Sequence, residues 1–223
     1  MKYLVITDER SASTTFAHIL PCFGLTCMSD PKTRTNQRDE LKNYKSNNKT
    51  TLLLEWCYLK YDVVKISLVS YNTYELKDMI NYCLKHNIKI IIFYRIEIYD
   101  RALSKIVATN LNSYHFFNKN IVHKKFKINI SNYKNAINDN YIKIKYILTF
   151  LEKNKHNYFL LLKETFFRDK NIGINFFKKN FNLDLLNTVE YEKRINTDYQ
   201  TSEKNKLILN RDEIINFNKK DIR

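Results

Sequence analysis

Apolar and polar residues alternate along the chain in two distinct patterns. Short apolar runs rich in β-branched residues are typical of buried parallel strands, whereas apolar residues three and four positions apart indicate helices with one buried face. The short runs predict strands near residues 3–7, 25–28, 63–69, 88–94 and 157–162. The helical spacing predicts helices near 13–20, 38–45, 51–60, 73–86, 98–110, 133–154, 171–180 and 211–218.

Strands and helices follow one another in turn, which is the order of an α/β protein with a central parallel sheet and helices on both faces. We expect about five strands in one domain, 1–223, because a chain of this length buries about 70% of its unfolded surface. Asn72 and, three residues later, Glu75 predict a capping box at the start of the helix near 73–86. The polar, poorly periodic stretch 31–50 is a candidate mobile lid or acceptor contact.

The first predicted strand runs into a short turn rich in hydroxyl groups. Tyr3 to Ile6 is apolar, and Arg10-Ser11-Ala12-Ser13-Thr14-Thr15 leads into the next helix. Backbone N–H groups at a helix N-terminus, the helix dipole and hydroxyl donors together suit the binding of an anion. An ordinary capped helix start is the alternative. The only glycines are Gly24 and Gly173, so neither a Walker A loop nor a G-x-G-x-x-G motif exists here.

A second strand, turn and helix follow later in the chain. The apolar run 89–94 ends in Arg95, and helical spacing begins near Ile98 and includes Ser104. Arg95 therefore follows a strand end, where ligands of open α/β sheets bind. The alternative is that Arg95 pairs with Glu97 or Asp100 and that Ser104 lies on a solvated face.

Both segments resemble motifs of the sulfotransferases that use 3′-phosphoadenosine 5′-phosphosulfate (PAPS). Residues 10–14 resemble the family's R-S-G-S-T loop, with Ala12 where the family has glycine. The nine-residue step from Arg95 to Ser104 resembles the 3′-phosphate clamp of the bacterial carbohydrate branch, which includes nodulation-factor and trehalose sulfotransferases. The resemblance implies a P-loop-like three-layer sandwich and PAPS as the donor. It assigns the 5′-phosphosulfate to Arg10, Ser11, Ala12, Ser13, Thr14 and Thr15, and the 3′-phosphate to Arg95 and Ser104.

Weaker similarities follow in the same order. The strand near 157–162 and the acidic residue after it resemble the family's Y-E-[DN]-L segment, in which Lys163 replaces the tyrosine and Glu164 matches the glutamate. Residues 175–183 resemble the next helix and turn. Residues 199–205 and 208–213 resemble the late loop and helix start of the bacterial branch, so we expect 195–223 to cover the nucleotide.

The resemblance implies sulfuryl transfer to a hydroxyl of a carbohydrate or polyol, without a metal. Arg10 is the candidate for stabilising the leaving phosphate oxygen. An acceptor hydroxyl needs a general base, and the first candidate is Asp30 before Pro31, with an ordinary turn aspartate as the alternative. His18 is the second candidate base, or a packed helix histidine. Lys65 resembles a family lysine near the active site, or it is an edge-strand lysine.

The chain is strongly basic, with 38 Lys and Arg against 23 Asp and Glu and a net charge of +15. Part of this charge reflects a bias toward Lys, Asn, Ile and Tyr that an AT-rich genome produces; the rest would attract an anionic donor. Nucleic-acid binding calls for basic residues grouped with exposed aromatics. The densest basic cluster, 123–127, meets this requirement loosely; the alternative is a solvated loop ahead of the strand-like 127–130. A non-catalytic basic protein that binds a nucleotide or nucleic acid is the competing function.

Composition also bears on location. Cys22, Cys27, Cys57 and Cys83 form no C-x-x-C motif and have no histidine at a zinc-like offset, so we expect free thiols in a reducing compartment. The apolar runs are far below the roughly 20 residues of a membrane span. Charges from Asp8 onward interrupt any signal peptide. These features predict a cytoplasmic, metal-free protein and leave its oligomeric state open.

Overall fold

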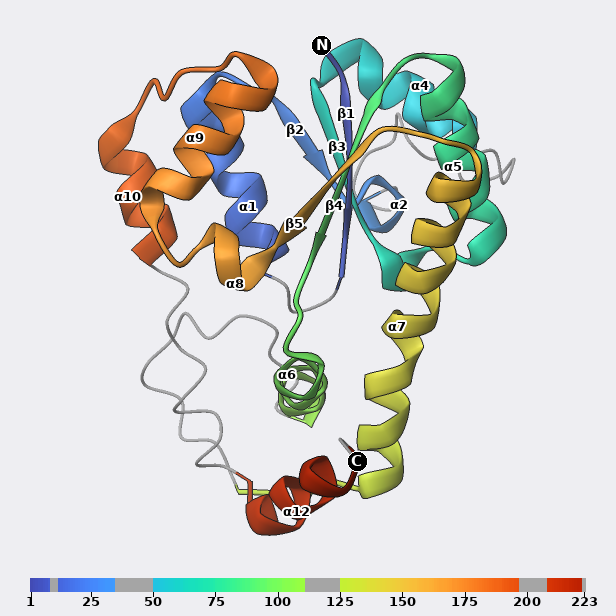
Figure 1. Ribbon diagram of the computed structural model, residues 1–223, viewed down its shortest axis with the longest axis vertical. Coiled ribbons are helices and arrows are strands. Elements are labelled where there is room, and N and C mark those ends of the chain that lie inside the picture. The colour runs from blue at the N-terminus through green and yellow to red at the C-terminus, as the bar shows by residue number, and fades with distance from the viewer. Residues whose placement is uncertain (9–11, 35–49, 111–124, 197–207, 222–223) are drawn as a thin grey trace.

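Five parallel strands form the centre of the computed structural model, which describes residues 1–8, 12–34, 50–110, 125–196 and 208–221 (Figure 1). The strands are β1 (Tyr3–Thr7), β2 (Cys27–Ser29), β3 (Val63–Ser67), β4 (Lys89–Tyr94) and β5 (Tyr158–Leu162). Their order across the sheet is β2-β3-β1-β4-β5, so β1 lies in the middle. Val5 of β1 is level with Lys65 of β3 and with Ile91 of β4. The predicted α/β fold with a parallel sheet of five strands is confirmed.

One face of the sheet is covered by α1 (Ser13–Ile19), α9 (Lys170–Phe181) and α10 (Thr188–Asn196), on the left in Figure 1. α1 continues directly into a 3₁₀ turn, η1 (Leu20–Phe23). Aromatic side chains dominate this part of the core: the ring of Phe177 lies 4.2 Å from that of Phe23 and 6.2 Å from that of Phe16. The helix that begins after β1 is thereby fixed against the sheet.

The other face is covered by α4 (Thr50–Lys60), α5 (Thr73–Lys85) and α7 (Ile130–Lys153), on the right in Figure 1. Leu54, Leu76 and Ile147 contribute one fully buried side chain from each helix. The predicted capping box is confirmed. Asn72 Oδ1 accepts from the N–H of Glu75 at 2.9 Å, and the Glu75 carboxylate accepts from the N–H of Asn72 at 2.8 Å.

Two helices, α6 (Ile98–Asn110) and α12 (Arg211–Asp221), lie beyond the carboxyl ends of the strands (Figure 1). They form a separate apolar cluster with the first turns of α7, in which Val107, Tyr133 and Ile214 are buried. Residues 195–223 were expected to cover the nucleotide, and 197–207 of this range lie outside the described residues.

Three short elements complete the fold: α2 (Pro31–Arg34), the 3₁₀ turn η2 (Leu68–Ser70) and α8 (Lys163–Phe166). The strand expected at 63–69 ends at Ser67, because η2 begins there. The strand expected at 25–28 is β2. The helix expected at 38–45 lies outside the described residues, as does most of the candidate lid 31–50, of which α2 and Thr50 are described.

Two expectations about helices needed correction. α10 was not predicted, because its buried side chains are only Tyr191 and Ile195, one turn apart in a polar sequence. The strand-like segment 127–130 is not a strand: Asn129 caps α7, with its side chain accepting from the N–H of Ser131 at 2.8 Å.

The close packing of α9 against α10 depends on Gly173. A Cβ at this position would lie 2.3 Å from the hydroxyl of Tyr191 and 3.1 Å from the ring of Phe166. The Tyr191 hydroxyl donates to the carbonyl of Lys170 at 3.0 Å, and its side chain is fully buried. α10 can therefore approach α9 closely only because residue 173 has no side chain.

Two further features bear on the expectations from composition. The helices within the described ranges include none with the length and apolar character that crossing a membrane requires. All four cysteines are free thiols, of which Cys27 is half-buried and the other three are buried.

Candidate functional site

The sheet topology predicts a ligand site at the carboxyl end of β1. The chain leaves β1 toward α1 on one face, whereas β3 and β4, the strands on either side, lead to α5 and α7 on the opposite face (Figure 1). Ligands of open α/β sheets bind outside the carboxyl ends of the strands, at the point where the connections after two adjacent strands lead to opposite faces of the sheet. The segment 9–11 begins at this point. Arg10 and Ser11 lie outside the described residues, so their roles stay predictions.

Ala12 bends the backbone into α1. Its φ of 59° and ψ of 28° lie in the left-handed region, which favours glycine. The Ala12 carbonyl accepts the first helical hydrogen bond, from the N–H of Phe16 at 3.0 Å. In the described part of the chain, no side chain caps this helix. The ordinary capped start is therefore not observed, and Ala12 has a glycine-like conformation where the sulfotransferase loop has glycine.

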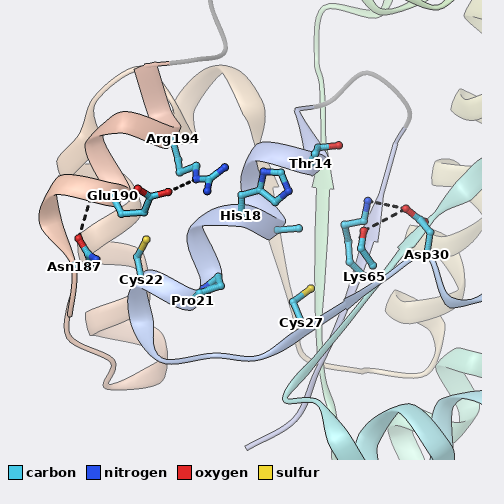
Figure 2. Close-up of a pocket in the computed structure, with 12 residues that line it drawn as sticks. Thr14, His18, Pro21, Cys22, Cys27, Asp30, Lys65, Asn187, Glu190 and Arg194 are labelled. Carbon is cyan, nitrogen blue, oxygen red and sulfur yellow. Dashed lines mark hydrogen bonds and ion pairs between the residues drawn. The ribbon is translucent and has the colours of Figure 1, made fainter. Parts of the chain in front are cut away.

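A cavity of about 640 Å³ lies beside the first turns of α1 (Figure 2). Its walls come from α1, η1, β2 with the residue that follows it, the middle of β3, and α10 with the residue before it. The lining residues are Thr14, Ala17, His18, Pro21, Cys22, Cys27, Ser29, Asp30, Lys65, Asn187, Glu190 and Arg194. Asp30, His18 and Lys65, which the sequence offered as separate candidates, thus share one cavity with Thr14 of the predicted anion loop.

Asp30 and Lys65 form an ion pair at one end of the cavity. Lys65 Nζ lies 2.8 Å from Asp30 Oδ2, and the side chains are 4% and 23% exposed. The N–H of Asp30 also donates to the carbonyl of Lys65 at 2.7 Å, with Asp30 in the left-handed conformation that aspartate tolerates. Lys65 lies on β3, between β2 and β1, so its interpretation as an edge-strand lysine is wrong.

His18 lies between the two ends of the cavity (Figure 2). Its side chain is exposed and lines the cavity, so the alternative of a packed helix histidine is wrong. Figure 2 shows the imidazole projecting from α1 into the space between Arg194 and Lys65. His18 can therefore reach a ligand in the cavity.

The far wall of the cavity comes from α10, which sequence reasoning missed. Arg194 Nε donates to Glu190 Oε1 at 2.6 Å, and Asn187 Oδ1 accepts from the N–H of Glu190 at 3.0 Å. The spacing of Glu190 and Arg194, four residues apart, was a visible helix signal. Their position beside α1 was not, because it depends on packing around Gly173.

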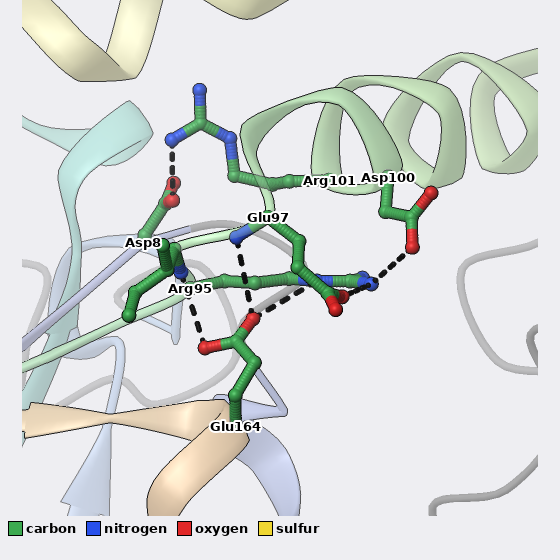
Figure 3. A network of polar contacts seen from close by, with 7 residues as sticks. Asp8, Arg95, Glu97, Asp100, Arg101 and Glu164 are labelled. Atoms are coloured by element: carbon green, nitrogen blue, oxygen red, sulfur yellow. Dashed lines mark hydrogen bonds and ion pairs between the residues drawn. The ribbon is translucent and has the colours of Figure 1, made fainter. Parts of the chain in front are cut away.

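Arg95 lies in a network of carboxylates at the carboxyl ends of β4 and β5 (Figure 3). Its side chain is 4% exposed, and Nη2 donates to Glu97 at 2.8 Å and to Asp100 at 3.1 Å. Glu164 Oε1 lies 3.6 Å from Arg95 Nε, and the Glu164 carboxylate accepts from the N–H groups of Ile96 and Glu97. The hydrogen bond from Arg95 lowers the pKa of Glu97.

This network agrees with the alternative that Arg95 pairs with Glu97 or Asp100. Three carboxylates around one guanidinium leave the cluster negative, so a phosphate would have to compete with them for Arg95. Glu97 and Asp100 are 55% and 57% exposed and have room to turn into solvent. Phosphate binding by Arg95 stays a prediction.

Ser104 is 7% exposed on α6, so its alternative placement on a solvated face is wrong. One turn earlier on the same helix, Arg101 forms a buried ion pair with Asp8, the residue after β1, at 2.6 Å. Arg101 also donates to the carbonyl of Ile137 on α7 at 2.9 Å. The ion pair connects Asp8, at the end of β1, to α6 (Figure 3), and the hydrogen bond to Ile137 extends the connection to α7.

Asp8 and Arg101 were not identified from the sequence as partners. Within the described ranges, no group of three or more His, Cys, Asp or Glu side chains is arranged so that it could hold a metal ion. No family model, curated protein or solved structure matches the chain. The resemblance to sulfotransferases therefore stays a prediction from the sequence motifs alone.

Proposed function

We propose that the protein transfers the sulfuryl group of PAPS to a hydroxyl of a carbohydrate-like acceptor. The 9–15 segment would hold the phosphosulfate, and the cavity beside it would hold the acceptor. The observation that supports this most directly is the shared cavity. It joins Thr14 of the predicted anion loop to Asp30, His18 and Lys65.

The acceptor would enter the cavity with one hydroxyl near Asp30 or His18. Its oxygen would attack sulfur in line with the bridging oxygen of the donor. As the new S–O bond forms, the bond between sulfur and the bridging oxygen breaks, and 3′-phosphoadenosine 5′-phosphate leaves. The acceptor proton passes to the base, since a positioned carboxylate or imidazole within about 2.6–3.2 Å can accept it.

Lys65 has a supporting role in this scheme. Its ammonium, buried and 2.8 Å from Asp30, fixes the carboxylate at the cavity wall. If His18 is the base, the same ammonium is available to balance charge on the transferring group. Arg10 would stabilise the leaving phosphate oxygen, because a guanidinium aimed at developing charge lowers the barrier.

Titration with nucleotides tests the donor assignment. Arg95 and Ser104 are assigned to the 3′-phosphate, and a charge-assisted hydrogen bond contributes about 1.5–3 kcal/mol, roughly ten- to a hundred-fold in affinity. We expect 3′-phosphoadenosine 5′-phosphate to bind that much more tightly than AMP, and Arg95→Ala to remove the difference. Arg168→Ala, at an exposed position, is the matched control. Equal affinities for the two nucleotides would exclude the assignment.

The sulfuryl-transfer rates of two variants distinguish Asp30 from His18 as the base that takes the proton of the acceptor hydroxyl. Asp30→Asn is expected to lower the sulfuryl-transfer rate strongly while the affinity for 3′-phosphoadenosine 5′-phosphate stays within about two-fold of wild type. If Asp30→Asn retains full rate and His18→Asn does not, His18 is the base. Tight binding of ATP or of a DNA duplex without any sulfated product would favour the competing function, a non-catalytic binding protein.

A further inference from the structure

β5 forms an open edge of the sheet. Within the described ranges it pairs with β4 alone, so the backbone N–H and C=O groups on its outer side have no strand beside them. The opposite edge, β2, is only three residues long and is followed at once by Asp30 and Pro31. Short length and proline are common means by which proteins prevent an edge from pairing further.

β5 has none of these protections. All five of its residues, Tyr158 to Leu162, are apolar in a chain of which 27% is charged. Each of the five is at least partly exposed, and the central residue, Leu160, is 45% exposed. The neighbouring helices α7 and α9 cover the two faces of the sheet and leave the edge in front of them in Figure 1. An exposed apolar edge of this kind favours pairing with another strand.

We propose that β5 pairs with β5 of a second copy of this chain, antiparallel across a two-fold axis at Leu160. This register places Leu160 opposite Leu160, Phe159 opposite Leu161, and Tyr158 opposite Leu162. Every pair is apolar, so the pairing would remove apolar surface of both copies from water. The next pair outward is Asn157 opposite Lys163, so no like charges meet. A self-complementary strand suits an isologous two-fold interface, and the two sheets become one of ten strands.

The net charge of the chain allows a second copy to be distinguished from an acidic partner by the effect of salt on binding. Each copy has a net charge of +15, so two copies repel each other except along the uncharged strand. Salt shortens the screening length from about 10 Å at 0.1 M to about 3 Å at 1 M. Added salt must therefore strengthen pairing with a second copy, whereas it would weaken the binding of an acidic partner.

Sedimentation velocity of the full chain over a concentration series, in about 0.1 M and about 1 M NaCl, tests the proposal. We expect a monomer–dimer equilibrium with a lower dissociation constant at the higher salt concentration. Leu160→Lys places two ammonium groups opposite each other and is expected to raise the dissociation constant by at least about ten-fold, since like charges directly opposite destabilise a strand pair. Leu59→Lys, on α4 at a position that is 79% exposed, is the matched control and is expected to change nothing.

A second measurement keeps the test independent of the variant. Amide hydrogen exchange of wild-type residues 158–162 is expected to slow as protein concentration rises, because pairing protects the outer amides. A chain that stays monomeric throughout, a dimer weakened by salt, or a dimer unaffected by Leu160→Lys would each overturn the proposal. None of these readouts depends on the proposed sulfuryl transfer.

Discussion

Gly173→Ala is a substitution for which two physical effects predict opposite signs. In a helix interior, alanine is favoured over glycine by about 1 kcal/mol. In α9, however, the added Cβ would lie 2.3 Å from the Tyr191 hydroxyl and 3.1 Å from the Phe166 ring. Both side chains are fully buried, so neither can move into solvent.

We expect the steric overlap of the added Cβ to outweigh the gain in helix propensity, so that the substitution destabilises the fold. Overpacking a core typically costs about 1–3 kcal/mol. Displacing the Tyr191 hydroxyl also breaks its hydrogen bond to the Lys170 carbonyl, at a cost of about 1 kcal/mol. After subtracting the gain in helix propensity, we expect Gly173→Ala to lower the free energy of unfolding by about 1–3 kcal/mol.

Urea unfolding followed by circular dichroism measures this change. Asn175→Ala, an exposed position on the same helix, is the control for helix propensity and is expected to be neutral or slightly stabilising. Tyr191→Phe removes the overlapping oxygen, so the double variant with Gly173→Ala should be more stable than the two single changes added together, by at least about 1 kcal/mol. A Gly173→Ala protein as stable as wild type would refute the reasoning, as would full additivity in the double variant.

Three other substitutions probe the site. Ala12→Gly removes the backbone strain of an alanine in the left-handed conformation. It is expected to raise the free energy of unfolding by up to about 1 kcal/mol in the same urea assay, and a lower free energy of unfolding would contradict the presence of this strain. Glu97 has a lowered folded-state pKa, so its pairing with Arg95 stabilises the fold above the ordinary value of 4.5 and is lost as the pH falls through the folded pKa. Glu97→Gln should therefore cost less than about 1 kcal/mol near pH 7, because Glu97 is largely exposed, and progressively less as the pH falls through the folded pKa; a loss that does not change with pH would exclude this account. Arg101→Ala leaves Asp8 buried without its guanidinium and is expected to cost about 3–5 kcal/mol by thermal unfolding at neutral pH, which a change below about 1 kcal/mol would contradict.

The strands β1, β3 and β4 were predictable because each contains at least two β-branched apolar residues, and β5 was predictable because all five of its residues are apolar. Helices with a broad apolar stripe, such as α5, were predictable for the same reason. α10 was not, since only two of its side chains are buried and its position depends on a glycine in a different helix. The local pattern of a segment predicts which of its side chains are buried. It does not predict which other element they pack against.

The same limit applies to the site. The pairing of Arg95 with Glu97 and Asp100 was visible as an alternative, because those charges are two and five residues away. Asp8 and Arg101 are 93 residues apart, and nothing in one sequence indicates that they meet. Asp30, His18 and Lys65 were each identified as candidates, but only the fold showed that they line one cavity.

The central position of β1 has a consequence for the newly made chain. β1 is the first of the five strands to be synthesised, yet its two neighbours in the sheet are β3 and β4, and the hydrogen bond from Thr7 to Ile66 closes a loop of 59 residues. At about 5–20 residues per second, a ribosome needs roughly 5–20 seconds to complete the chain through Tyr94. Until Ser67 has been made, the apolar segment from Tyr3 to Thr7 has no partner strand, and until Tyr94 has been made it has a partner on one side at most. The order of synthesis therefore exposes the most deeply buried strand for longest, which makes it a natural binding site for a chaperone on the nascent chain.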